Sequence, residues 1–469
     1  MFVNRTSELE YLAKVNKEQR ARFLIIYGRR RIGKTELLRH FSQNLPHLFF
    51  SADLSSEQEQ LRQFTEKLHR VTGDTFLQSQ PFTSWEALLR YLFAHVVDDV
   101  PVIIIDEFPY LCAGNPALPS ILQKVWDDAG KQSAVFFILC GSYMSFMEKE
   151  VLGNKSPLFG RRTGQMLLEP MTFHDVEAFF PQSSREERVS IYAALGGTPA
   201  YLQRFRPEKT FEQNIKDEIL DKNAMLYGEP RFLLMEELRE PSLYFSILKS
   251  IAFGRNRLNE IVQDTGISER HTVNKYLSVL RELYMVQREV PITEEQPHKS
   301  RKGIYRLHDP FFRFWFRYVF PNLSYLEEGD IEYVWQHKIL PGLDSFIGPV
   351  FEQICIQVLK QRNRSNTLPF KASRIGRWWD RQHEIDIVAY DGGSAGVENA
   401  GAASGNYLLC ECKWTAKPVG LNILEKLRTK AAFFPQAGRI YYGLFSKSGF
   451  REELRDAAAG RDDVLFFDY

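Results

Sequence analysis

Two glycines, a lysine and a threonine near the start of the chain have the spacing of a phosphate-binding loop, Gly28-x4-Gly33-Lys34-Thr35. The glycines let the backbone curl, so that successive N–H groups face phosphate oxygens at the start of the following helix. Lys34 is then expected to reach the β- and γ-phosphates, and the Thr35 hydroxyl to bind Mg²⁺. The spacing predicts a site for ATP and Mg²⁺ built from Gly28, Arg29, Arg30, Arg31, Ile32, Gly33, Lys34, Thr35 and Glu36.

A pair of carboxylates follows a strongly apolar run further along the chain. The run Val102–Ile105 is typical of a buried strand, and Asp106 and Glu107 come directly after it. Ligands of open parallel sheets bind at this edge, so we expect Asp106 to contribute to the magnesium site. Glu107 is placed to orient or polarise the water that attacks the γ-phosphate. The alternative is a solvated acidic pair that begins a loop.

Three more polar residues follow the next apolar run. Ser142 is expected either to contact the γ-phosphate or the attacking water, or to cap the helix that begins near Tyr143. Arg161 and Arg162 are candidates for the positive charge that stabilises phosphoryl transfer, in the same subunit or a neighbouring one. Paired arginines are more often solvated. We include Arg162 in the predicted nucleotide site, although the sequence does not decide between the two.

A second set of charged residues lies on two strand-like stretches near the C-terminus. Side chains alternate along a strand, so Glu411 and Lys413 share one face, and Asp386 can approach Glu411 if the two stretches pair. Two carboxylates suit Mg²⁺ or Mn²⁺, and a metal with a neighbouring lysine suits phosphodiester cleavage. Glu352 is a lone acid on a largely apolar helical stretch, which calls for a reason. The alternative is a charged strand pair in a domain that does not cut.

Two basic groups of residues are candidates for contacts with DNA. One lies on a predicted helix and the other on the loop that follows it. In helix-turn-helix docking, residues near the start of the helix reach base edges and loop lysines reach the backbone. Such modules also serve in protein docking or as ATPase lids, which is the alternative. The residues are Arg270, His271, Asn274 and Lys275 on the helix, and Lys299, Arg301 and Lys302 on the loop.

The elements that must position these residues can be read from the apolar pattern. Short apolar runs between helical stretches indicate a parallel sheet covered on both faces. The predicted strands are Phe23–Tyr27, Leu48–Ser51, Val102–Ile105 and Ala134–Cys140. The segment 241–306 instead predicts three short helices and a strand-loop-strand wing. Its predicted elements are helices Ser242–Phe253, Leu258–Thr265 and Ser268–Leu283 and strands Met285–Val290 and Gly303–Leu307.

Composition excludes several classes of protein. The chain of 469 residues is long enough for two to four domains, and a net charge of +1 argues against a general polyanion-binding surface. Its five cysteines contain no Cys-x-x-Cys pair, which disfavours a disulfide framework or zinc site and favours the cytoplasm. The N-terminus lacks a signal-peptide pattern, and no uninterrupted apolar run reaches the ~20 residues of a membrane span. We therefore expect no membrane partner.

Residues 1–235 resemble the archaeal-type ATPase family within the AAA+/STAND group of P-loop ATPases. This resemblance implies an N-terminal segment beside the adenine, a helical lid and nucleotide-driven domain movement. The matching motifs are Phe2-Val3-Asn4-Arg5 with Glu8, Gly28 to Thr35, Ile105-Asp106-Glu107, Cys140-Gly141-Ser142, Phe159-Gly160-Arg161-Arg162-Thr163 and Gly196-Gly197-Thr198-Pro199.

The C-terminal part resembles the PD-(D/E)xK nuclease superfamily, in the form that accompanies this ATPase family. The resemblance implies that Glu352 is the helix acid, Asp386 and Glu411 are the metal acids, and Lys413 is the catalytic lysine. The proline that often precedes the first metal acid is replaced here by Ile385.

The predicted fold class is α/β, with three parts. A P-loop ATPase domain with a parallel sheet and helical lid spans 1–235, a winged-helix domain 236–325, and a small α/β nuclease-like domain 326–469. The leading hypothesis is an ATPase, homo-oligomeric in some states, that binds DNA and cleaves it with a metal. The alternatives are a DNA-binding ATPase with an inert C-terminal domain, and a STAND-type signalling switch whose nucleotide controls oligomerisation.

Overall fold

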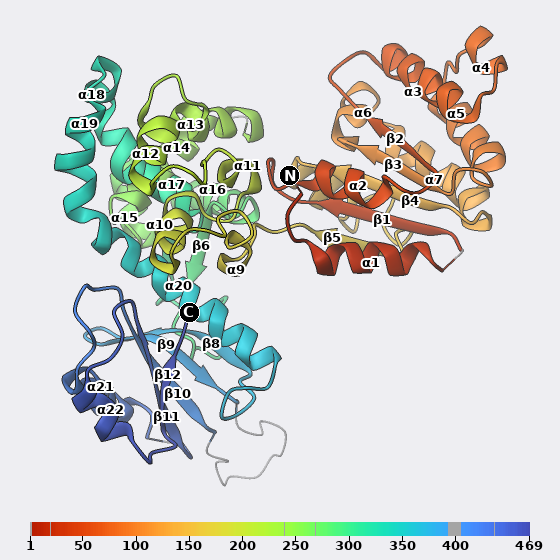
Figure 1. Ribbon diagram of the computed structural model, residues 1–469. Helices are drawn as coiled ribbons and strands as arrows, with labels where there is room; N and C mark the ends of the chain where they lie inside the picture. Colours follow the sequence, from red (N-terminus) through yellow and green to blue (C-terminus); the bar gives the residue numbers. More distant parts are fainter. Residues whose placement is uncertain (1, 19, 239, 268, 393–404, 436) are drawn as a thin grey trace. The chain divides into compact units, whose positions relative to one another are not determined.

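The computed structural model describes residues 2–18, 20–238, 240–267, 269–392, 405–435 and 437–469 (Figure 1). The chain divides into two compact units. The first comprises Met1–Met171 and Thr198–Gln203, and the second comprises Thr172–Gly197 and Arg204–Tyr469. Most of the helical segment that follows Met171 is therefore part of the second unit. Domain boundaries at residues 235 and 325 stay a prediction.

A five-stranded parallel sheet forms the centre of the first unit, in the order β2-β3-β4-β1-β5. The predicted parallel sheet is confirmed, and it contains one strand more than the apolar runs indicate. That strand, β5, lies at an edge and is only partly buried, so its sequence carries no long apolar run. The strands are β1 (Arg22–Tyr27), β2 (His47–Ser51), β3 (Val102–Asp106), β4 (Phe136–Gly141) and β5 (Gly164–Leu167).

Helices cover both faces of this sheet, as the sequence predicts. On one face, Leu12 and Leu37 pack against Ile26 of β1. On the other face, the ring of Trp126 lies 5.0 Å from that of Phe23, which points the opposite way along the same strand. The helices of this unit are α1 (Thr6–Asn16), α2 (Lys34–Ser42), α3 (Glu57–Thr72), α4 (Phe76–Ser79), α5 (Trp85–Tyr91), α6 (Phe108–Gly114), α7 (Leu118–Asp128), α8 (Met144–Phe146) and α11 (Pro199–Leu202).

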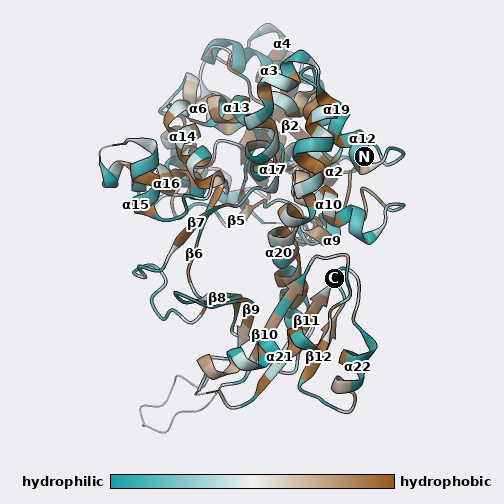
Figure 2. Ribbon diagram, turned by 90° about the vertical axis from the view of Figure 1, so that its left-hand side faces the viewer, coloured by the Kyte–Doolittle hydropathy of each residue, from teal (hydrophilic) through white to brown (hydrophobic). Residues whose placement is uncertain are grey.

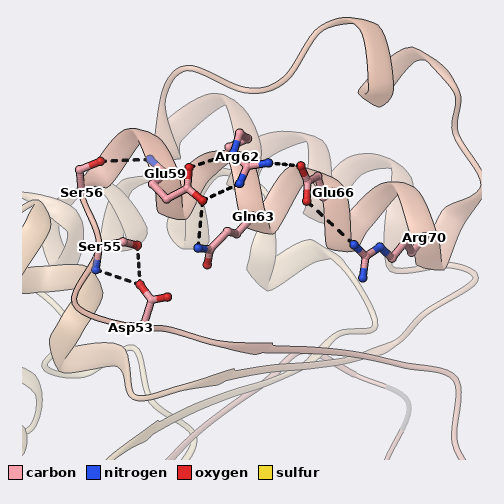
Figure 3. A network of polar contacts seen from close by, with 8 residues as sticks. All are labelled: Asp53, Ser55, Ser56, Glu59, Arg62, Gln63, Glu66 and Arg70. Atoms are coloured by element: carbon pink, nitrogen blue, oxygen red, sulfur yellow. Dashed lines mark hydrogen bonds and ion pairs between the residues drawn. The ribbon is translucent and has the colours of Figure 1, made fainter.

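Helix α3 combines a polar cap and surface ion pairs with a buried apolar face. The Ser56 hydroxyl caps it by accepting a hydrogen bond of 3.4 Å from the Glu59 backbone N–H. On its outer face Arg62 pairs with both Glu59 and Glu66, one turn to either side (Figure 3). These side chains are exposed, so the ion pairs contribute little to stability, and burial of Phe64 fixes the helix on the sheet.

Three helices and a pair of antiparallel strands occur in the second unit where the sequence predicts them between residues 241 and 306, and their assignment as a winged helix stays a prediction. The helices are α14 (Pro241–Ala252), α15 (Leu258–Thr265) and α16 (Arg270–Glu282), and the antiparallel strands are β6 (Val286–Glu289) and β7 (Ile304–Leu307). Gly266 ends α15 with a φ of 67°, a conformation that favours glycine. Ser268, the predicted start of the third helix, lies outside the described residues.

Further helices flank this segment. They include α10, whose Val189, Ala193 and Leu195 are buried. They are α9 (Phe173–Val176), α10 (Arg185–Leu195), α12 (Phe211–Ile215), α13 (Met225–Glu237), α17 (Pro310–Phe314), α18 (Leu323–Glu328), α19 (Ile331–Val334) and α20 (Leu343–Arg364).

A second five-stranded sheet, in the order β12-β11-β10-β9-β8, completes the second unit. Strands β8, β9 and β10 are antiparallel, whereas β10, β11 and β12 are parallel and are joined through α21 and α22. Strands β9 to β12 contribute buried apolar side chains to one core cluster, and apolar residues of this sheet are brown in Figure 2. The elements are β8 (Arg374–Trp379), β9 (Glu384–Tyr390), β10 (Tyr407–Lys413), α21 (Leu421–Thr429), β11 (Ile440–Ser446), α22 (Glu452–Ala458) and β12 (Val464–Phe467).

One stretch, Ile331–Arg364, is long and apolar enough to cross a membrane by length and composition. Charged residues such as Lys338 and Asp344 interrupt this stretch, so it contains no uninterrupted apolar run of the length of a membrane span. Within this stretch α20 packs against strands β8, β9 and β10. Its buried side chains, Phe346, Ile347, Val350, Phe351, Ile354, Cys355 and Leu359, belong to the core of the unit.

Candidate functional site

The phosphate-binding loop connects the end of β1 to the start of α2. Arg31 and Gly33 have φ values of 68° and 91°, so the loop curls through two left-handed positions before α2 begins at Lys34. A Cβ on Gly28 would lie 2.5 Å from the carbonyl oxygen of Leu168, so this position requires glycine. The predicted glycine spacing thus corresponds to a tightly curled loop at a helix N-terminus.

The groups predicted to bind the triphosphate and its metal converge at this loop. The Lys34 ammonium is buried and donates to the carbonyl oxygens of Gly28 and Arg29 at 2.8 and 3.1 Å. The Thr35 hydroxyl donates a hydrogen bond of 2.7 Å to Oδ2 of Asp106. A hydroxyl and a carboxylate oxygen are hard ligands of the kind that Mg²⁺ prefers, so the residues present fit this metal.

Glu107 and Ser142 are brought together at the carboxyl ends of β3 and β4. Glu107 has a φ of 54°, and the Ser142 hydroxyl donates to its Oε2 at 2.8 Å. The Ser142 backbone N–H lies 3.3 Å from the same oxygen. Ser142 therefore does not act as the helix cap considered as the alternative, because its hydroxyl is directed to Glu107.

Arg161 and Arg162 have different surroundings. Arg161 forms an ion pair of 3.0 Å with Asp127. Arg162 donates a hydrogen bond of 2.9 Å to the carbonyl oxygen of Leu152. Burial and Glu148 raise the pKa of Tyr27, and Arg162 acts in the opposite direction, which places its charge near the residue that precedes the loop. Of the pair, Arg162 is the one whose charge acts on Tyr27, and a role in phosphoryl transfer remains a prediction.

Two residues that support the loop were not assigned this role from the sequence. Arg5 donates to the carbonyl oxygens of Ile32 and Glu169 at 3.1 and 2.8 Å. Arg29 donates a hydrogen bond of 3.2 Å to the hydroxyl of Thr198. These contacts join residues that are 27 to 169 positions apart. The N-terminal motif and the Gly-Thr-Pro motif could therefore be recognised in the sequence, but the residues that they contact could not.

The second set of predicted residues meets on the second sheet. Antiparallel pairing of Ile387 with Cys410 puts the next residues, Asp386 and Glu411, opposite each other. The Lys413 ammonium donates to Oε1 of Glu411 at 2.7 Å, and Lys430 lies 3.1 Å from the other oxygen. The predicted pairing of the two strands is therefore observed.

Burial makes this centre electrostatically unusual. Burial, Glu411 and Glu352 raise the pKa of Asp386 to about 7, although its Oδ2 accepts a hydrogen bond from the Cys412 backbone N–H. Burial acts to lower the pKa of Lys413, but Glu411, Asp386 and Cys412 together outweigh burial, so this pKa is raised. A divalent cation would relieve the repulsion between the carboxylates, so Asp386 and Glu411 fit such a group.

Glu352 extends from α20 towards this centre but has a cationic partner. It lies 3.3 Å from a guanidinium nitrogen of Arg377 on β8, and burial raises its pKa in spite of that charge. Within the described ranges, no group of three or more His, Cys, Asp or Glu side chains is spaced to hold a metal ion. Glu352, Asp386 and Glu411 therefore lie in the same region, but they are not spaced to bind one metal ion.

The predicted DNA-binding residues of α16 form its exposed face. Arg270, His271, Asn274 and Lys275 are exposed, whereas Val273, Tyr276, Leu277 and Leu280 are buried. On the loop between β6 and β7, Lys299, Arg301 and Lys302 are exposed, and Lys302 pairs with Glu294 at 2.7 Å. The start of this loop is attached to the second sheet, because the Ile292 backbone N–H donates to the Arg377 carbonyl oxygen at 2.9 Å.

Comparison with known proteins gives two matching family models. Residues 2–205 match the model described as an ATPase domain predominantly from Archaea. Residues 315–426 match one described as Archaea bacterial proteins of unknown function.

The chain is also similar to individual proteins over different parts of its length. The uncharacterized protein MJECL04 of Methanocaldococcus jannaschii is 38% identical over 391 residues, which cover 83% of this chain and 84% of the relative. An uncharacterized ATP-binding protein of the same organism, MJ0423, is 52% identical over 44 residues, or 9% of this chain and 75% of that protein. The solved structure of the Walker-type ATPase paby2304 of Pyrococcus abyssi aligns with a TM-score of 0.52 and 18% identity, covering 67% of this chain and 96% of the other.

Proposed function

The chain belongs to a family of P-loop ATPases found predominantly in archaea, and on this premise we propose that it uses ATP to control the processing of DNA. In this proposal the first unit hydrolyses ATP, the helix and wing segment binds DNA, and the sheet β8–β12 cleaves phosphodiester bonds. The observation that carries the cleavage step is the position of Asp386 opposite Glu411, with Lys413 bonded to Glu411.

In the nucleotide site, Thr35 and Asp106 would hold Mg²⁺, which would neutralise charge on the β- and γ-phosphates. Lys34 would give up its hydrogen bonds to the Gly28 and Arg29 carbonyl oxygens and donate to phosphate oxygens of ATP instead. Glu107 would orient the attacking water, and Ser142 would hold the Glu107 carboxylate in place. The hydrogen bonds already described place Lys34, Thr35 with Asp106, and Glu107 with Ser142 for these roles.

In the cleavage site, Asp386 and Glu411 would hold Mg²⁺ or Mn²⁺, which acidifies a bound water and stabilises charge on the phosphate. Lys413 would keep the attacking water or a phosphate oxygen beside Glu411. Lys430, on the other oxygen of Glu411, would limit the charge of the carboxylate pair while no metal is bound.

DNA would bind along the exposed face of α16. A helix whose start carries Arg270, Asn274 and Lys275 on one face offers donors to base edges and phosphates. The attachment of Ile292 to β8 would make the wing a mechanical link between DNA binding and the cleavage sheet.

A second candidate function is a DNA-binding ATPase whose C-terminal sheet does not cut. The observation in its favour is the pairing of Glu352 with Arg377, which withdraws one acid from a metal. The two candidates differ in whether the C-terminal sheet cleaves DNA.

The deciding experiment follows 5′-labelled single- and double-stranded DNA with Mg²⁺ or Mn²⁺ for the wild type, Lys413→Ala and Lys417→Ala. Lys417 is an exposed lysine shortly after the same strand and serves as the matched control. We expect cleavage by the wild type and Lys417→Ala and its loss in Lys413→Ala. Equal cleavage by all three proteins would exclude this site, and no cleavage with either metal would favour the inert alternative.

A further inference from the structure

A cavity of about 220 Å³ lies in the second unit where the wing meets α20 and β8. Its lining includes three arginines and two glutamates from five different elements. Arg306 comes from β7, Arg313 from α17, Arg377 from β8, Glu289 from β6 and Glu352 from α20. The cavity lining thus combines five charged side chains with apolar ones that include Ile251, Leu307 and Ile356.

Arg377 is shared among several carboxylates. Its guanidinium lies 3.7 Å from Glu289 and 3.3 Å from Glu352, and it also lies 3.8 Å from the more exposed Glu384. None of these distances is that of a short bidentate pair, which for Arg and carboxylate would be about 2.7–2.9 Å. The Nε atom of Arg377 is buried and has no hydrogen-bond partner within the described chain.

The positive charges of the other two arginines, Arg306 and Arg313, are also not fully paired with carboxylates. The buried Nε of Arg306 lies 3.2 Å from Oε2 of Glu289, which is an ion-pair distance, but neither atom makes a hydrogen bond within the part of the chain that the structure describes. Arg313 forms no ion pair with any described carboxylate, and its polar contact is the Phe346 carbonyl oxygen at 3.2 Å. Burial and the neighbouring Arg306 lower the pKa of Arg313 to about 10, as expected where positive charge is in excess.

An anion is the ligand that such a lining favours. Buried charges are costly unless they are paired and hydrogen-bonded, and three guanidinium groups here face two inner carboxylates. The planar guanidinium matches phosphate oxygens in a two-pronged geometry, with charge-assisted hydrogen bonds. The volume is sufficient for a phosphate group with accompanying water.

We propose that this arginine cavity binds a phosphate group of a nucleic-acid strand, and that the phosphate draws Arg377 away from Glu352. The phosphate would bridge Arg306 of the wing and Arg377 of the cleavage sheet. Glu352 would then be free to join Asp386 and Glu411 at the metal. This second step rests on the proposed cleavage function, whereas binding of the phosphate does not.

The first test measures binding of inorganic phosphate to the full chain by calorimetry, with a non-hydrolysable ATP analogue and Mg²⁺ filling the P-loop. The variants are Arg313→Gln, Arg306→Gln and, as the matched control, Arg317→Gln, which removes an exposed arginine one turn further along from Arg313. We expect about tenfold or greater weakening in each cavity variant and no change in the control, since each loses a charge-assisted hydrogen bond. Equal affinity in all four proteins would overturn the proposal.

Folding is checked by the thermal midpoint of each variant. If Arg313→Gln is unfolded, Arg313→Lys and Arg306→Gln carry the test, because lysine retains the charge without the two-pronged geometry. The Arg313→Lys variant should bind phosphate more weakly than the wild type. The double variant, which carries both Arg306→Gln and Arg313→Lys, should bind phosphate more weakly still. Wild-type affinity in both would contradict the cavity site.

The second test identifies the source of the phosphate. An uncleavable phosphorothioate DNA strand should compete with inorganic phosphate in the wild type, and this competition should be lost in Arg306→Gln. Undiminished phosphate binding at saturating DNA would overturn a nucleic-acid source and leave free phosphate as the ligand. Loss of cleavage in Lys413→Ala tests the proposed function separately, because Lys413 does not line the cavity.

Discussion

The side-chain hydroxyl of Ser142 donates a hydrogen bond of 2.8 Å to Oε2 of Glu107. These residues are at the carboxyl ends of neighbouring parallel strands, β4 and β3, beside the loop that ends in Lys34 and Thr35. The bond fixes the direction of a carboxylate whose proposed task is to orient water. Its geometry therefore makes Ser142 a positioning residue for Glu107.

We expect Ser142→Ala to slow ATP hydrolysis by about tenfold, corresponding to ~1.4 kcal/mol, while ATP binding is retained. Glu107→Gln should slow it by about a hundredfold or more, because it alters the water-orienting group itself. Steady-state turnover and nucleotide titration measure the two effects. Ser120→Ala, on an exposed position of α7, is the control. A Ser142→Ala enzyme with unchanged turnover would show that the hydrogen bond is incidental.

Gly28→Ala should disrupt the nucleotide site by displacing the backbone of the phosphate-binding loop. The added Cβ would lie 2.5 Å from the Leu168 carbonyl oxygen, so the loop must move or β5 must shift. We expect loss of ATP binding and destabilisation by about 1–3 kcal/mol, as for other overpacked positions.

Thermal unfolding and nucleotide titration measure these effects of Gly28→Ala. The matched change Gly348→Ala, in α20, meets no atom within 4 Å and should leave both properties unchanged or raise stability slightly. Normal ATP binding by Gly28→Ala would refute the importance of this close approach.

The raised pKa of Asp386 predicts a pH dependence of stability in metal-free protein. Burial, Glu411 and Glu352 raise this pKa from 3.8 to about 7, so the native state binds a proton that the unfolded state releases. The contribution of this group to stability should therefore be complete below about pH 4 and be lost as pH rises to about 7.

Thermal midpoints in EDTA between pH 4.5 and 7.5 measure this effect. Asp386→Asn should show a smaller fall in midpoint with rising pH than the wild type, because asparagine does not titrate. Identical slopes for the two proteins would contradict the raised pKa.

Substitution of exposed cations on α16 should weaken DNA binding in a salt-dependent way. We expect Lys275→Ala to reduce the slope of log affinity against log salt by about one if it contacts a phosphate. Arg270→Ala should in addition relax base preference if it reaches a base edge.

Fluorescence anisotropy with labelled DNA at several salt concentrations provides the measurement for α16. Lys426→Ala, which removes an exposed lysine from α21, is the charge-matched control. If Lys426→Ala and Lys275→Ala weaken binding equally, α16 is not the DNA-binding face.

Local patterns were sufficient for the elements with strong signals. The uninterrupted apolar runs of β1, β3 and β4 predicted the parallel sheet because these strands are buried throughout. Glycine spacing predicted the loop before Lys34, and the turn at Gly266 predicted the break between α15 and α16. The edge strand β5 was missed because half-buried residues give no comparable pattern.

The sequence by itself determined which chemical groups are present: a loop of bare amides with a lysine and threonine, two strand-end acids, and a period-two arrangement of Glu411 and Lys413. The tertiary structure decided which of them meet. In the folded chain Ser142 donates a hydrogen bond to Glu107, and Arg5 donates one to the carbonyl oxygen of Ile32 in the loop. Glu352 forms an ion pair with Arg377 instead of joining Asp386. These choices depend on contacts between residues far apart in the chain and on competition among buried charges, and local periodicity carries no information about either.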